Sequence, residues 1–155
     1  MKRKSLTVLA AVIIGVGVLI YWFTNKKVDA FALQPEDRTL VVAGKLIYQQ
    51  NCAACHGANL EGQPNWRTRL PNGRLPAPPH DKTGHTWHHT DELLFKITKL
   101  GNAAIVGNGY ESDMMGFKDQ LSDKEIVAVL SYIKSTWPEK IRTRHDRMNK
   151  QSQKN

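Results

Sequence analysis

The sequence predicts an all-α protein with long loops. Two stretches place apolar residues at helical spacing behind capping residues, and no run alternates apolar and polar residues long enough to predict a strand. A third stretch, residues 57–89, contains five prolines and shows no period, which excludes a long helix or a central strand there. The expected fold is a small helical domain with one unusually long loop.

The composition indicates one folded domain with charged ends. The chain has 155 residues, 41% of them apolar and 23% charged, so it is neither a disordered polyelectrolyte nor a polytopic membrane protein. Five basic residues against one acidic residue give segment 1–32 a charge of +4, and six against two give segment 139–155 the same charge. Because these segments account for the whole formal charge of +8, the residues between them have no net cationic charge to offer nucleic acid.

Residues 5–25 are uncharged and mostly apolar, and they are numerous enough to cross a bilayer as a helix. A basic start, an aromatic cluster at 21–23 and two following lysines are typical of a membrane segment with its N-terminus inside. We expect residues 1–32 to be a retained anchor and linker, with the rest on the outer, periplasmic side of the cytoplasmic membrane. The alternative is a signal peptide cleaved after Ala32, at the end of an Ala-Phe-Ala sequence.

The folded domain is expected to span residues 33–138. Its first helix should start at Pro35, which suits a first turn, and run to about Gln50; Glu36 and Asp37 would face the positive end of the helix dipole.

Two further helices are predicted by their caps. Thr90 precedes one that stops at Gly101, and the capping box from Ser122 to Glu125 starts a last helix at roughly 123–136. Their expected core faces are Leu93, Leu94, Ile97 and Leu100 in the first, and Ile126, Val129, Leu130 and Ile133 in the second.

Two segments are not predicted to be helical. Loop 57–89 is long enough that we expect it to wrap a functional site. Segment 139–155 is polar and basic, and we expect it to be a disordered tail.

Cys52, Cys55 and His56 form a C-x-x-C-H pattern that uses both cysteines of the chain. This pattern is the signature of c-type haem attachment, in which two thiols reach the two vinyl groups of one porphyrin and the next histidine becomes an iron ligand. A thioredoxin-like redox pair would need a preceding strand, and a disulfide across two residues would be strained. A zinc site would need a fourth ligand, which one of the histidines at 80–89 could supply. We expect one covalently bound haem c.

A haem iron needs either a second axial ligand for electron transfer or an open position for chemistry. Met114 and Met115 are the candidate ligands, because they lie in a loop before the last helix and away from any apolar stripe. Met148 lies in the charged tail and is implausible. The ordinary alternative for a methionine is a gap-filling core residue.

Residues 35–138 resemble a class I c-type cytochrome, of the monohaem, membrane-anchored bacterial type. Gly44, Tyr48 and the C-x-x-C-H pattern match the family's N-terminal motif, and residues 130–133 match its C-terminal helix. The resemblance implies a cytochrome c-like fold in which these two helices cross, with Gly44 against Tyr132.

The resemblance also implies the remaining haem contacts. The family's M-P-x-F segment aligns with residues 114–117, which makes Met114 the second iron ligand beside His56 and puts Met115 at the usual proline position. Pro64 is the choice for the proline whose carbonyl accepts the proximal histidine's N–H.

Loop 57–89 ends in a segment rich in histidine and tryptophan. Its members are His80, His85, His88, His89 and Trp87, with Trp66 further upstream. Trp87, one or two of the histidines and Arg74 are expected at the haem propionates. A second metal site, such as copper, or a histidine as the sixth iron ligand are the alternatives.

The resemblance implies a membrane-tethered carrier of single electrons, not an enzyme, with no small-molecule substrate. Its partners would be a terminal oxidase, a cytochrome bc complex or a dehydrogenase. The alternatives are a haem enzyme or gas sensor with a displaceable sixth ligand, and a fixed haem subunit of an oxidoreductase complex.

Overall fold

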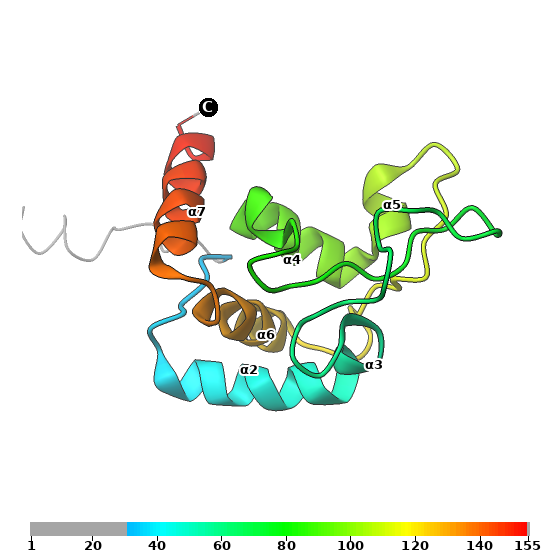
Figure 1. Cartoon of the computed structure of the whole chain (residues 1–155). Coiled ribbons are helices and arrows are strands. Elements are labelled where there is room, and N and C mark those ends of the chain that lie inside the picture. The colour runs from blue at the N-terminus through cyan, green and yellow to red at the C-terminus, as the bar shows by residue number, and fades with distance from the viewer. Residues whose placement is uncertain (1–30, 155) are drawn as a thin grey trace, which may run out of the picture. The chain divides into compact units, whose positions relative to one another are not determined.

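The computed structural model describes residues 31–154, whose regular elements are all helical (Figure 1). In chain order they are α2 (Arg38–Asn51), α3 (Ala53–His56), the 3₁₀ helix η1 (Thr86–His88), α4 (Asp91–Leu100), α5 (Asn102–Val106), α6 (Asp123–Ser135) and α7 (Glu139–Ser152). Within this range there is no strand, only one isolated bridge between Gly101 and Met115. The all-α prediction is confirmed for this part of the chain.

The predicted membrane segment 5–25 lies outside the described residues. Among residues 31–154, no helix combines the length and the apolar character that a bilayer crossing requires.

α2 begins three residues later than Pro35. Pro35 lies in a turn, and the Asp37 side chain caps the helix by accepting a hydrogen bond from the Leu40 backbone N–H at 3.1 Å. A carboxylate at this position satisfies one of the helix's unpaired N–H groups, so the helix starts directly after it.

α2 packs along α6, as Figure 1 shows. The two backbones approach so closely at Gly44 that a Cβ there would overlap the carbonyl oxygen of Ala128 and meet the Tyr132 Cβ at 3.0 Å. The rings of Tyr48 and Tyr132 pack beside this crossing with their centroids 5.6 Å apart. The predicted crossing of Gly44 against Tyr132 is confirmed.

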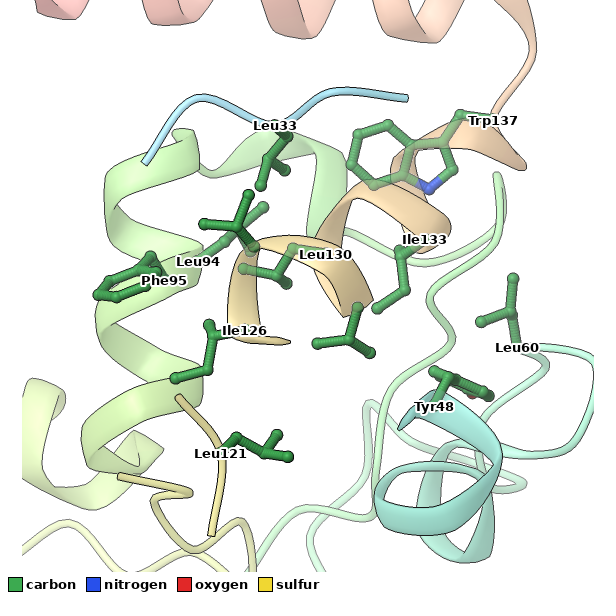
Figure 2. Packing of buried hydrophobic residues seen from close by; sticks show 12 residues of the cluster. Leu33, Tyr48, Leu60, Leu94, Phe95, Leu121, Ile126, Leu130, Ile133 and Trp137 are labelled. Atoms are coloured by element: carbon green, nitrogen blue, oxygen red, sulfur yellow. The ribbon is translucent and has the colours of Figure 1, made fainter. Parts of the chain in front are cut away.

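The core is centred on α6 (Figure 2). The caps predicted for α4 and α6 are present, including both hydrogen bonds of the Ser122–Glu125 capping box. All four residues predicted for the core face of α6 are buried. In α4 the buried apolar residues are Leu94 and Phe95, whereas Leu100 is 46% exposed, because the apolar face is rotated by about one position toward Phe95.

α7 corrects the prediction of a disordered tail at 139–155. His145 on this helix is 0% exposed, and its Nε2–H donates to the His89 backbone oxygen at 2.8 Å. Its ring also meets the Trp137 indole edge-on, with centroids 5.1 Å apart. α7 is therefore part of the packed domain.

A buried polar network joins α7 to α4 and α6. The Asp91 carboxylate accepts hydrogen bonds from the Leu33 backbone N–H and from Asn149 Nδ2, both at 3.0 Å. Lys134, 2% exposed, places its Nζ 3.8 Å from Asp91 and 2.7 Å from Asp146. These polar residues give α7 its buried face although the helix has few apolar side chains.

Loop 57–89 has η1 as its only helix within the described residues, which confirms a long loop. α5 is a short helix that the sequence analysis did not predict, and it is followed by the loop that carries Met114.

Candidate haem site

The two cysteines lie at the junction of α2 and α3. The Cys52 backbone N–H donates to the Tyr48 carbonyl at 2.8 Å, so Cys52 closes α2 and α3 follows immediately. Cys55 is exposed, Cys52 is half-buried, and no disulfide joins them. Burial, assisted by the neighbouring Cys55, raises the pKa of the Cys52 thiol to about 11. Both thiols are free to bond to a common group.

His56 is the last residue of α3 and is 7% exposed. Its Nδ1 lies 2.8 Å from the Pro78 carbonyl oxygen. Because a carbonyl can only accept, Nδ1 carries the proton, and the Nε2 lone pair is available to a metal. Burial lowers the pKa of His56, partly offset by this hydrogen bond, which keeps the ring neutral as a ligand must be.

Pro78, not Pro64, supplies the carbonyl that accepts from His56 Nδ1, so the choice of Pro64 was wrong. Pro64 is exposed in a turn. The chain doubles back after it, as the hydrogen bond from the Gln63 backbone N–H to the Ala77 oxygen at 2.8 Å shows. This return brings the second proline cluster of the loop to His56.

Tyr48 fixes the chain just beyond the histidine. Its hydroxyl donates to the Gly57 carbonyl oxygen at 2.7 Å, and the side chain is 0% exposed. Burial raises the Tyr48 pKa, so the hydroxyl remains a donor at all physiological pH values. Tyr48 therefore holds the chain on both sides of His56. Its carbonyl accepts from the Cys52 N–H, and its hydroxyl donates to the Gly57 carbonyl.

Met114 and Met115 differ clearly in their surroundings. Met114 is half-buried; its backbone N–H is held by the Ser112 hydroxyl at 3.1 Å, and its carbonyl accepts from the Asn102 N–H at 3.3 Å. Met115 is 61% exposed, and its Sδ lies 3.9 Å from Gln120 Nε2. Of the two methionines, Met114 is therefore the one whose side chain is partly shielded from solvent.

Arg74 links the long loop to the methionine loop. Its guanidinium pairs with Asp113, the residue before Met114, and with Glu111 at 3.3 Å. Arg74 was expected at the haem propionates, but here it is engaged by two carboxylates. These pairs connect residues 111–113 to residue 74 of the long loop.

The histidine-rich part of the loop is arranged by aromatic stacking. His80 stacks on His56, His85 stacks on Trp66, and His88 stacks on Trp87. Among residues 31–154, no group of three or more histidine, cysteine or acidic side chains is arranged to hold a metal ion, which gives no support to a second metal site.

Trp87 has one unexplained feature. Its indole Nε1–H is buried and has no hydrogen-bond partner among residues 31–154. An unpaired buried donor is costly, so this N–H is suited to an acceptor on a bound group, as expected for a haem propionate.

Comparison with known proteins agrees with this geometry. The family model described as cytochrome c matches residues 41–137, and the chain belongs to this family. Its cofactor is haem c, bound covalently, and Cys52 and Cys55 occupy the attachment positions.

A particular relative is cytochrome c-555 of Prosthecochloris aestuarii, which is 32% identical over 65 residues. The matched segment covers 38% of this chain and 66% of that protein, slightly under two thirds of its length. No solved structure matches the chain.

The residues present fit a haem c. Two unpaired thiols, a neutral buried histidine with a free Nε2 and an indole N–H without a partner among residues 31–154 would each bind a different part of such a group. The cysteines and the histidine were predictable from their fixed spacing. The Pro78 contact and the stacking of His80 on His56 were not, because they depend on the path of the long loop.

Proposed function

We propose that the chain is a membrane-tethered, monohaem carrier of single electrons, with His56 and Met114 as the axial iron ligands. Membership of the cytochrome c family supports electron transfer with redox protein partners. The observation that carries the ligand assignment is the contrast between half-buried Met114 and exposed Met115 in the loop before α6.

The surroundings of His56 suit electron transfer. When bound, haem iron exchanges one electron between its ferrous and ferric states, and methionine ligation with burial favours the ferrous state. The hydrogen bond from His56 Nδ1 to Pro78 restrains the direction of the ring, and the burial of His56 limits access of water to it. These contacts hold the His56 ring in one orientation, which suits an iron ligand that stays in place while the iron changes its charge.

A filled sixth position is tested by gas binding and redox titration of the full chain. A carrier with His56 and Met114 ligation should titrate as a single one-electron couple, and its reduced form should bind carbon monoxide very slowly. Rapid and stoichiometric binding of carbon monoxide to the unmodified protein would instead support the enzyme or gas-sensor alternative.

Residues 5–25 support the tether, because an uncharged run of this length suits a bilayer. A retained anchor holds the haem domain at the outer face of the cytoplasmic membrane and raises its local concentration near membrane-bound redox partners. Such partners would be a terminal oxidase, a cytochrome bc complex or a dehydrogenase.

The anchor is tested on protein exported by a bacterial host. The haem-stained chain should stay in the membrane pellet after carbonate extraction, and its intact mass should include the residues before Ala30. A soluble mature chain beginning at Leu33 would contradict the tether but leave the assignment of the haem ligands unaffected.

A further inference from the structure

His80 lies in direct contact with the proximal histidine. The rings of His80 and His56 are stacked, with centroids 3.9 Å apart and planes inclined by 25°. The Tyr48 ring meets the His80 ring in an edge-on arrangement, with centroids 6.3 Å apart. The long loop thus brings a second imidazole against the flat face of the ring that binds the iron.

His80 is held in place at both its backbone and its side chain. Its N–H donates to the Leu60 oxygen at 2.8 Å, and its carbonyl accepts from Trp137 Nε1 at 2.8 Å. Its Nδ1 lies 2.8 Å from the hydroxyl of buried Thr86. Because that hydroxyl donates to the Pro79 oxygen at 3.4 Å, we assign the His80 proton to Nδ1, which donates to Thr86.

His56 needs such a support for a geometric reason. The hydrogen bond to Pro78 restrains Nδ1, but a single hydrogen bond still tolerates some rotation of the ring about its Cβ–Cγ bond. A rigid ring stacked on its face blocks that rotation. Pro78 and His80 are two residues apart in the loop, so the loop supplies one contact that sets the direction of the ring and one that sets its plane.

We propose that His80 is a positioning residue that fixes the plane of the His56 imidazole and thereby tunes the redox potential of the haem. The proposal rests on the proposed ligation of iron by His56. Ligand orientation and groups beside a ligand both affect a metal's properties. The face of a neutral aromatic ring is electron-rich, so it stabilises the more positive imidazole of the ferric state.

The test compares His80→Leu with His80→Phe in the mature haem protein. His80→Leu removes the ring, so the midpoint potential should rise and the electron paramagnetic resonance signal of the ferric form should shift and broaden as His56 becomes freer to rotate. His80→Phe retains a ring without the hydrogen bond to Thr86. It should therefore stay closer to the wild type in both measurements.

Two further variants separate this role from simple packing. Thr68→Val replaces an exposed residue of the same loop that lies away from His80 in the sequence, and it should change neither measurement. Thr86→Val frees the unaltered His80 ring and should broaden the signal, which provides a test even where His80→Leu matures poorly.

The proposal is overturned where His80→Leu leaves both the potential and the resonance signal at wild-type values. It is also overturned where the Leu and Phe variants are perturbed equally, because the ring itself would then have no role. Failure of the proposed function gives a different result, since the wild-type protein would itself lack the resonance signal of a six-coordinate, low-spin iron.

Discussion

A single hydroxyl group connects α2 to the chain directly after His56. Tyr48 is buried against α6, and its hydroxyl reaches past α3 to the Gly57 carbonyl. A hydrogen bond of this kind stabilises a fold modestly, whereas the loss of one partner leaves the other group unsatisfied. Tyr48 therefore helps to position the chain next to His56 as well as packing in the core.

Tyr48→Phe should lower the free energy of unfolding by about 1–2 kcal/mol, because the Gly57 oxygen loses its hydrogen-bond donor. Tyr132→Phe is the matched control, since the Tyr132 hydroxyl has no hydrogen bond among residues 31–154 and its ring packs on Tyr48. Urea unfolding of the haem protein measures both. Equal stabilities of the two variants would contradict a structural role for this hydroxyl.

The close packing of α2 against α6 depends on Gly44, which has no side chain. The obstacle to a Cβ at Gly44 is the backbone carbonyl of Ala128, which cannot rotate away as a side chain can. Helices that meet this closely transmit any added volume into their relative position. Since α2 leads directly into Cys52, a shift of α2 would also move the haem attachment site.

Gly44→Ala should destabilise the domain by about 3 kcal/mol or more, at the upper end of the cost of overpacking. Lys45→Ala on the exposed face of the same helix should change stability by less than about 0.5 kcal/mol. Thermal unfolding followed by circular dichroism compares them. A Gly44→Ala variant as stable as Lys45→Ala would show that the helices do not cross at this residue.

α7 introduces a pH-sensitive residue into the core. Burial, with the nearby Lys134, lowers the pKa of His145 below its ordinary 6.5, although Asp91 acts in the opposite direction. The unfolded chain therefore takes up a proton below about pH 6.5 that the folded chain does not. Stability from this residue is complete above that pH and is lost as the pH falls toward the folded pKa.

His145→Gln keeps a side-chain N–H for the His89 oxygen but cannot be protonated. Between about pH 6.5 and pH 5, it should reduce the slope of the unfolding free energy against pH. The reduction corresponds to the uptake of up to one proton, or roughly 1 kcal/mol per pH unit. Urea unfolding at a series of pH values measures this slope. His88→Gln at an exposed position is the control. An unchanged slope in His145→Gln would rule out His145 as a source of the acid sensitivity.

At the level of the whole molecule, the sequence was informative wherever the relevant contacts are local. The caps of α4 and α6 act within four residues, and the spacing of Cys52, Cys55 and His56 is a local geometric requirement. The Pro78 contact could not be predicted, because it depends on how a loop without regular structure folds back across 22 residues.

The same limit explains the error at the C-terminus. α7 has a polar composition. Its buried residue is His145, the half-buried Asn149 beside it pairs with Asp91 of α4, and only Ile141 packs a partly buried apolar side chain against the core cluster. Apolar periodicity cannot reveal such a face. As a result, the charge of +4 in segment 139–155 belongs largely to the folded domain, which is more basic than the sequence analysis assumed.

The central claim is that Met114 completes the coordination of the iron opposite His56. A weak long-wavelength absorption band of the oxidised protein reports a bond between ferric iron and methionine sulfur, and it is measured in the full chain, in Met114→Ala and in Met115→Ala. We predict the band in the wild type and in Met115→Ala, and its loss in Met114→Ala. Loss of the band in Met115→Ala alone, or its absence from the wild type, would contradict this assignment.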